Sequence, residues 1–334
     1  MDDYVHIDYN KGETVMYSNK KVLLIAGGGT LGTHTSNELL RLGASVDIIC
    51  PEEKVSNDPK LRFHRSLVSR ELLEELFSKY HYDGVVDFIH YKNPEDYKEM
   101  YNYLRGHVDH IIFLSSYRVY ANSNEKITEE SPRLLDVETD KEFLAKENYA
   151  IPKSICEDWL RSEKKGEHWT IVRPVISFSH TRLDLLLHSQ TDILKAVDAG
   201  RPILMPKTVR DYGAGIDWAG NSGKLIANLL FKPHTYGETY TVYSNHGYSW
   251  GDVTKAYEEV TGVQVVWCEE DEYVASLPFD KKPWLYDMWY HDRIYSRWID
   301  GSKIIKATGL SKDDFATIAE GIQYEIDVLN WKRP

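Results

Sequence analysis

The chain has 334 residues, of which 42% are hydrophobic and 28% are charged, and its formal net charge is −12. This size supports one large α/β domain or two lobes with a substantial core. The acidic balance disfavours nucleic acid as a partner, and no apolar run approaches the roughly 20 residues of a membrane-spanning helix. The first residues lack the basic and apolar regions of a secretory signal, and the three distant cysteines have neither metal-ligand nor disulfide spacing. We therefore expect a cytoplasmic protein without a metal and without a membrane partner.

Residues 1–20 precede the first strongly apolar segment of the chain. Two short segments with strand character, 5–9 and 14–17, flank turn-forming residues at 10–13. This pattern predicts a small N-terminal hairpin that is appended to the main fold.

A glycine-rich turn follows the apolar run at residues 22–25. Helical spacing continues over 33–42, and a second apolar run occupies 45–50. The glycines fit G-x-G-x-x-G, in which one glycine permits a sharp turn, one lets backbone approach a pyrophosphate, and one lets helix and strand pack closely. The helix N-terminus then presents free N–H groups to phosphates. The predicted cofactor contacts of this dinucleotide-binding unit are Gly27, Gly29, Thr30, Leu31 and Gly32.

Cys50 ends the second strand, at the place where NAD-preferring proteins carry an acidic residue for the adenosine ribose. A cysteine cannot accept both ribose hydrogen bonds as a carboxylate can. No arginine lies beside it to hold a 2′-phosphate, and Glu52 and Glu53 would repel one. The sequence therefore predicts NAD or NADP, with Cys50 near the cofactor, and does not choose between them.

Strand and helix patterns alternate through the next 65 or so residues. The expected strands cover 61–64, 84–89 and 110–114, and the expected helices cover 71–77 and 94–104. Such alternation predicts a doubly wound parallel sheet of the Rossmann type. Because ligands of these sheets bind beyond the carboxyl ends of the strands, Asp87, Phe88 and Ser115 are further predicted cofactor contacts.

Ser116 follows the fifth strand, and Tyr149 and Lys153 stand four residues apart at the start of the next expected helix. Positions with this spacing share one helix face, so the phenol and the ammonium can share a site. A phenol ordinarily gives up its proton only near about pH 10, and an adjacent ammonium favours the phenolate. A serine hydroxyl can hydrogen-bond a substrate carbonyl oxygen. We predict that these three residues are catalytic.

Taken together, these motifs resemble the extended short-chain dehydrogenase/reductase superfamily, the group of NAD-dependent nucleotide-sugar epimerases and dehydratases. The resemblance covers nearly the whole chain from about residue 21. Its matching stretches are 26–35, 113–120, 149–153, 170–174, 209–212, 216–219, 298–303 and 308–309. It implies a catalytic triad of Ser116, Tyr149 and Lys153, in which Tyr149 and Lys153 also contact the cofactor.

The resemblance also places residues around the cofactor and the substrate. Pro174 falls at the cofactor, whereas Arg118, Ile176 and Arg210 fall at the substrate. Arg210 matches the position at which family members bind a nucleotide-sugar diphosphate. Members commonly dimerise through two helices per subunit, here the ones that begin near Pro94 and Tyr149, so we expect a homodimer.

Several positions depart from the family pattern. Ile176 replaces the asparagine that usually follows the Arg-Pro motif, which weakens a nucleotide-sugar interpretation. Tyr117 and Arg118 replace the acidic pair of the 4,6-dehydratases, which speaks against dehydration by that mechanism. Cys50 and Ser66 replace acidic cofactor contacts.

Beyond Pro174 the alternation weakens, and we expect a smaller mixed α/β substrate lobe. Its expected helices cover 181–199, 250–261 and 316–329, while a helix over 217–230 and a strand over 240–243 return to the main domain. The predicted organisation is an extension (1–20), a dinucleotide-binding domain (21–177 and 210–245) and a substrate-binding lobe (178–209 and 246–334). The aromatic segment 284–293 is either a wall over the substrate or a packed segment. Candidate anion binders are Arg182, Arg201, Arg210, Arg293 and Arg297.

The leading hypothesis is an NAD(P)-dependent sugar-nucleotide epimerase or oxidoreductase. It would act on a small molecule such as a nucleotide sugar, with proton transfer by Tyr149 and hydride transfer at a secondary alcohol or ketone. One alternative is a ketoreductase of secondary metabolism, which Ile176 and the aromatic segment favour. The other is a nucleotide-binding regulator without turnover, which the intact Ser-Tyr-Lys set disfavours.

Overall fold

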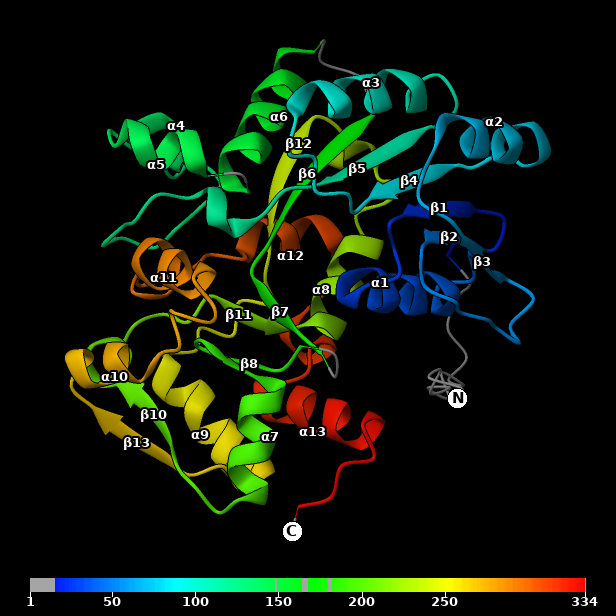
Figure 1. The fold of residues 1–334 in the computed structure, drawn as a ribbon. Coiled ribbons are helices and arrows are strands. Elements are labelled where there is room, and N and C mark those ends of the chain that lie inside the picture. Colours follow the sequence, from blue (N-terminus) through cyan, green and yellow to red (C-terminus); the bar gives the residue numbers. More distant parts are fainter. Residues whose placement is uncertain (1–15, 148, 164–167, 180–181, 334) are drawn as a thin grey trace.

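A seven-stranded sheet forms the centre of the molecule, and all its strands pair in parallel (Figure 1). The computed structural model describes residues 16–147, 149–163, 168–179 and 182–333. In spatial order the strands are β12 (Glu238–Val242), β6 (Trp169–Pro174), β5 (His110–Leu114), β4 (Gly84–Asp87), β1 (Lys21–Ile25), β2 (Ser45–Cys50) and β3 (Leu61–Arg65). The predicted doubly wound fold is confirmed, and the strand expected at 240–243 is its edge strand β12.

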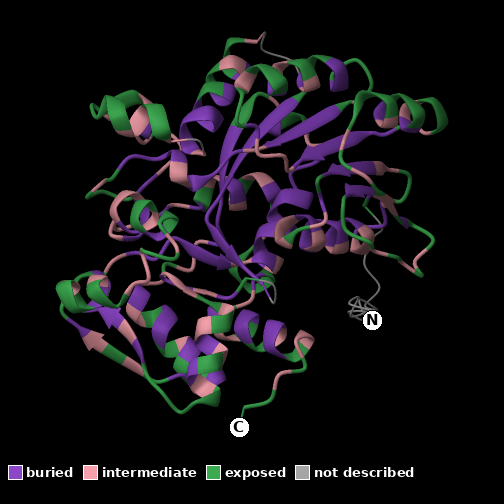
Figure 2. Cartoon of the chain, viewed as in Figure 1, coloured by how far each residue is buried: buried purple, intermediate pink, exposed green. Residues whose placement is uncertain are grey.

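Helices cover both faces of this sheet, because successive side chains of a strand point to opposite faces. Val22 and Leu24 of β1 pack into one apolar cluster, whereas Leu23 and Ile25 pack into another. The first cluster includes residues of α1 (Thr30–Arg41), α8 (Ala219–Ala227) and α12 (Ser302–Thr308). The second includes residues of α2 (Arg70–Lys79), α3 (Pro94–Leu104) and α6 (Ala150–Ser162). Apart from the edge strand β3, of which only Leu61 is buried, the strands between them are buried along almost their whole length (Figure 2).

The second lobe lies against the end of the main domain and has its own core, in which Trp250 and Trp289 are fully buried. Its parallel strand pairs are β7 (Ile176–Phe178) with β11 (Ile216–Trp218) and β10 (Ile203–Pro206) with β13 (Val265–Cys268). Its helices are α7 (Gln190–Asp198), α9 (Trp250–Thr261), α10 (Glu270–Ser276), α11 (Trp284–Met288) and α13 (Ile318–Val328). Short helices α4 (Leu134–Val137) and α5 (Lys141–Lys146) precede α6. Within the described ranges, no helix combines the length and the apolar composition needed to cross a bilayer.

Two expectations for the second half of the chain need correction. The helix expected over 181–199 is in fact a hairpin, β8 (Asp184–Leu185) with β9 (His188–Ser189), followed by α7. Leu186 takes a left-handed conformation with φ 58°, which ends any helix there, and Ser189 caps the N-terminus of α7. Helix α12 falls in the range predicted for the substrate lobe, yet it packs on the main sheet.

The predicted N-terminal hairpin falls mostly on residues 1–15, which lie outside the described part of the chain. The described segment begins just before Tyr17, which is buried. Its hydroxyl donates to the carbonyl oxygen of Leu230 at 3.0 Å, and its backbone N–H donates to Leu42 at 2.8 Å. The extension is therefore anchored where α1 ends and where the chain leaves α8.

Candidate active site

The glycine loop between β1 and α1 packs as the sequence motif requires. A Cβ on Gly32 would lie 2.1 Å from the carbonyl oxygen of Gly27, so only a glycine lets α1 approach the loop this closely. A Cβ on Gly27 would lie 2.7 Å from the Cβ of Leu24. Among the described residues, nothing lies within 4 Å of a Cβ placed on Gly29. The loop is thus tightly packed on its inner side and open at Gly29.

That opening fits the pyrophosphate of a dinucleotide. Gly29 is the N-cap residue of α1, and no side chain caps the helix by a hydrogen bond at this position. The first turn of the helix also carries no acidic residue. The N–H groups of this turn therefore face the opening without a competing side-chain carboxylate, which favours an anion there. Thr30 extends from this turn, and its hydroxyl lies 3.0 Å from the hydroxyl of Ser179.

The three predicted catalytic residues come together at the carboxyl end of β5. Ser116 follows this strand and its Oγ accepts a hydrogen bond from the N–H of Arg118 at 3.2 Å. Tyr149 is the N-cap residue of α6, and its N–H donates to Glu147 at 3.0 Å. The Nζ of Lys153 lies 5.4 Å from the centroid of the Tyr149 ring. The spacing of four residues thus places the Lys153 ammonium near the Tyr149 ring, and the catalytic role of the three residues stays a prediction.

Lys153 and Asp87 lie behind the cavity rather than in it. Lys153 is buried and donates to the carbonyl oxygen of Leu114 at 2.5 Å. Burial lowers the pKa of Lys153, whereas the nearby Tyr149 and Asp87 oppose that shift. Burial raises the pKa of Asp87 to about 6, against hydrogen bonds from the Ile89 N–H at 3.0 Å and the Tyr91 hydroxyl at 2.7 Å. The ammonium is thus held at a fixed place beneath the phenol.

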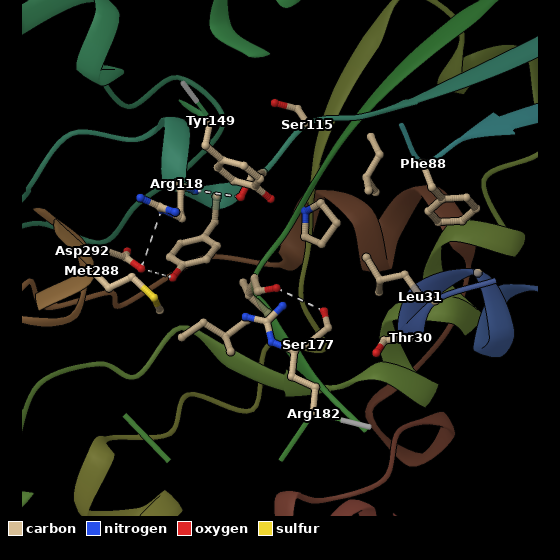
Figure 3. Close-up of a pocket in the computed structure, with 18 of the residues that line it drawn as sticks. Thr30, Leu31, Phe88, Ser115, Arg118, Tyr149, Ser177, Arg182, Met288 and Asp292 are labelled. Carbon is tan, nitrogen blue, oxygen red and sulfur yellow. Dashed lines mark hydrogen bonds and ion pairs between the residues drawn. The ribbon is translucent and has the colours of Figure 1, made fainter. Parts of the chain in front are cut away.

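One cavity of about 450 Å³ joins the glycine loop to the catalytic residues and the second lobe (Figure 3). Most of the residues predicted from the sequence line it. These are Gly29, Thr30, Leu31, Gly32, Phe88, Ser115, Ser116, Arg118, Tyr149, Pro174 and Ile176, together with the candidate anion binders Arg182 and Arg293. Cofactor and substrate positions that are distant in sequence therefore share a single space.

Cys50 and Arg210 lie outside the lining of this cavity. Cys50 is buried beneath the loop, 2.7 Å from a Cβ placed on Gly28, and burial raises the pKa of its thiol. The guanidinium of Arg210 lies 5.4 Å from the ring centroid of Trp267, in the second lobe. The geometry gives Arg210 no contact with the cavity, and its role in substrate binding stays a prediction.

The second lobe contributes Met288, Asp292 and Arg293 to the cavity, all from segment 284–293. The aromatic rings of this segment do not form a wall over the site within the described lining. Trp289 is buried against Tyr273 instead, with ring centroids 5.2 Å apart.

A π-helical turn over 289–293 turns the polar pair of this segment inward. Such turns widen a helix by one residue and recur at functional sites. Sequence reasoning gave Asp292 no role. The available signal was an acid beside an arginine within an otherwise aromatic segment.

Comparisons with known proteins agree with this architecture. No protein-family model and no curated protein sequence matches the chain. An epimerase from the methanogen Methanothermobacter thermautotrophicus has a TM-score of 0.68 and 14% identity, over 95% of this chain and 95% of that one. The Bordetella bronchiseptica enzyme WbmF, in complex with NAD+ and UDP, has a TM-score of 0.63 and 14% identity, over 95% and 94% of the two chains. The UDP-glucose 4-epimerase of Thermotoga maritima, with UDP-glucose, has a TM-score of 0.63 and 13% identity, over 93% and 98%.

The chain has the fold of these epimerases. At such low identity the likeness establishes the fold, and it covers both the main domain and the second lobe. It agrees with the fold that the resemblance to the extended short-chain dehydrogenase/reductase superfamily implies.

Proposed function

We propose that this protein is an NAD-dependent epimerase or oxidoreductase that acts on a secondary alcohol or ketone of a small molecule. One observation carries the proposal. Tyr149 and Ser116 line the same cavity as the open glycine loop, and the Lys153 ammonium lies 5.4 Å from the Tyr149 ring. This is the arrangement that proton transfer at a hydroxyl beside a hydride acceptor requires.

Each residue has a distinct part in the proposed reaction. Tyr149 takes the proton from the substrate hydroxyl, and it returns a proton in the reverse direction. Ser116 donates a hydrogen bond to the oxygen that becomes a carbonyl. The Lys153 ammonium is fixed by the carbonyl oxygen of Leu114 and places a positive charge beside the Tyr149 ring, where the proton is transferred.

The described residues fit a nicotinamide dinucleotide. Its pyrophosphate suits the opening at Gly29 and the N-terminus of α1, and Phe88 and Pro174 line the same cavity as Tyr149. When bound there, the cofactor supplies the acceptor of the hydride. An epimerase keeps the oxidised substrate in place for return of the hydride to its other face, whereas a reductase releases it.

A nucleotide sugar is our first candidate for the substrate. Solved structures of the same fold include complexes with UDP and with UDP-glucose. A keto substrate without a nucleotide is the second candidate, because Ile176 places an apolar side chain in the cavity. Screening UDP-, dTDP- and GDP-sugars by thermal shift with NAD present separates the two. A ligand at 100 times its Kd should stabilise the protein by about 2.7 kcal/mol, and no shift with any of them would exclude the sugar nucleotide.

The Tyr149→Phe variant tests the proposed chemistry. We expect turnover to fall about 100-fold or more, because the phenol is the only proton carrier we assign to the substrate hydroxyl. The Kd for NAD, measured by fluorescence titration, should change little, since the ring remains. A variant with near wild-type turnover would refute the assigned role, and a wild-type protein without NAD binding would refute the proposed function.

A further inference from the structure

Arg118 occupies the turn that follows the catalytic serine. Its guanidinium lies over the Tyr149 ring, with Cζ 5.0 Å from the ring centroid, and its side chain is 26% exposed toward the cavity (Figure 3). Its backbone N–H binds Ser116. The charged side chain of Arg118 therefore lies beside the Tyr149 ring, while its backbone binds the Ser116 hydroxyl.

Three arginines surround Asp292. The buried Asp292 accepts a hydrogen bond from the Tyr117 hydroxyl at 2.8 Å and pairs directly with Arg293. Arg297 lies 3.8 Å from Asp292 and Arg118 lies 3.9 Å from it. Burial alone would raise the pKa of Asp292, yet these arginines hold it below its usual range. The carboxylate is thus ionised, and its Oδ2 atom accepts from both Tyr117 and Arg293, whereas its Oδ1 atom has no hydrogen-bond partner among the described residues.

The acids near this cluster do not balance its positive charge. Glu147 is the other carboxylate near Arg118, at 3.9 Å, and its second oxygen accepts the N–H groups of Tyr149 and Ile151. Within 4.0 Å, two acids therefore face three guanidinium groups. Asp184 also acts on Arg293, but it is itself paired with Arg182 at 2.8 Å. The Nε and one Nη of the buried Arg297 have no hydrogen-bond partner among the described residues. Excess positive charge in a poorly solvated place is costly unless an anion joins it.

Arg118 is the member of this cluster that can meet such an anion. Both of its carboxylate neighbours are 3.9 Å away, beyond hydrogen-bond distance. Arg293, in contrast, is buried and bound to Tyr117, Asp292 and the carbonyl oxygen of Leu186. Among the described residues, the Arg118 fork thus keeps donors for a planar, bidentate acceptor.

We propose that Arg118 binds a carboxylate that the substrate carries close to its reacting carbon. The inference rests on the proposed function, because it places the reacting carbon at Tyr149. An acidic side chain at position 118 would repel such a substrate, whereas the arginine selects it. The substrate class is therefore an acidic sugar or a related hydroxy acid.

The position of Arg118 favours a carboxylate on the reacting ring over a more distant diphosphate. Its guanidinium lies against the Tyr149 ring itself, so a group bound to it lies within about one sugar ring of the phenol. Arg118 and the catalytic Ser116 belong to the same turn of the chain, since they are two residues apart. A group at this distance is recognised together with the hydroxyl that reacts.

The experiment compares ligands that differ in one carboxylate. UDP-glucuronate and UDP-glucose form one pair, glucuronate and glucose form a second, and UDP alone reports on the diphosphate. Each Kd is measured by calorimetry with NAD at saturation. The proteins are wild type, Arg118→Met, Arg118→Lys and Arg70→Met, the last being an exposed arginine of α2 that pairs with Glu74.

We expect wild type and Arg70→Met to bind the acidic member of at least one pair about tenfold or more tightly. Arg118→Met should bring this ratio to about one, and Arg118→Lys should keep part of it, because lysine retains the charge but not the bidentate fork. Thermal unfolding of each variant checks that it is folded. The Lys variant keeps the test valid if the Met variant is unstable.

Three results would overturn the inference. They are a ratio near one for both pairs in wild type, an unchanged ratio in Arg118→Met, or an equal loss of UDP and UDP-glucuronate affinity in that variant. The last would assign Arg118 to a diphosphate. None of them touches the proposed function, which depends on NAD binding and on the loss of turnover in Tyr149→Phe.

Discussion

Glu52 lies two residues beyond the end of β2, yet its side chain reaches the glycine loop. Its Oε2 atom is 2.6 Å from a Cβ placed on Gly28, next to the buried Cys50. Lys54 donates to the carbonyl oxygen of Gly28 at 2.7 Å and holds the segment against the loop. The carboxylate that Cys50 does not provide for an adenosine ribose is therefore available from Glu52.

We expect the wild-type protein to bind NAD more tightly than NADP, and Glu52→Gln to narrow that preference about tenfold. The carboxylate would accept the ribose hydroxyls and repel a 2′-phosphate, whereas the amide does neither to the same extent. Fluorescence titration gives both Kd values. The matched control is Glu53→Gln, because Glu53 is exposed and pairs with Arg65. Equal affinity of the wild type for the two cofactors would refute this assignment of Glu52.

In the turn from β1 into α1, one glycine is needed for packing and another leaves space for a ligand. Gly32 is needed for packing, since a Cβ there would meet the backbone of Gly27. Gly29 has an ordinary φ of −86°, so its backbone suits other residues, and it faces open space. The fold does not require a glycine at position 29, so we attribute this glycine to the space that the pyrophosphate of the cofactor needs.

Gly29→Ala and Gly32→Ala should therefore differ. We expect Gly29→Ala to change the free energy of unfolding by about 1 kcal/mol or less while weakening NAD binding about tenfold or more, because its methyl group enters the space for the pyrophosphate. Gly32→Ala should lose about 1–3 kcal/mol of stability through overpacking, together with NAD binding. Urea unfolding and NAD titration measure the two effects. If Gly29→Ala bound NAD like the wild type, the pyrophosphate would lie elsewhere.

The whole molecule shows which parts of this architecture a sequence can predict. The strands of the main sheet are short apolar runs bounded by turn residues, so β5 and α3 appear within the expected ranges. The second lobe lacks such regularly spaced apolar runs. Its hairpin at 184–189 depends on the left-handed backbone of Leu186, which no sequence pattern predicts.

The residues of the site also include some that the sequence could predict and some that it could not. Ser116, Tyr149 and Lys153 could be found because local spacing places them on one sheet edge and one helix face. The contact between Tyr117 and Asp292 joins residues 175 positions apart, so it exists only once the second lobe has packed on the main domain. The excess of arginines was visible in the sequence as scattered charges and became a cluster only in three dimensions.

The expected homodimer would join two whole molecules through one face of the main domain. Helices α3 and α6 lie side by side on one face of the sheet, as the resemblance requires of a dimer surface (Figure 1). Ile155 is 38% exposed on α6, among more polar neighbours such as Asp158. A two-fold axis brings the same patch of both subunits together, so Ile155 would be covered by the partner's copy of this surface. We propose a homodimer through α3 and α6.

Ile155→Asp tests that proposal. In a two-fold interface one substitution places two new carboxylates at related positions and removes two apolar contacts, so we expect the dimer to dissociate about tenfold or more readily. Sedimentation velocity across a concentration series measures this change. Val266→Asp is the control, because Val266 is a similarly exposed apolar residue, 47% exposed on β13 of the second lobe. If Val266→Asp dissociated the dimer and Ile155→Asp did not, the subunits would meet through the second lobe. A wild-type protein that stays monomeric throughout the series would leave Ile155 facing solvent and would refute the dimer itself.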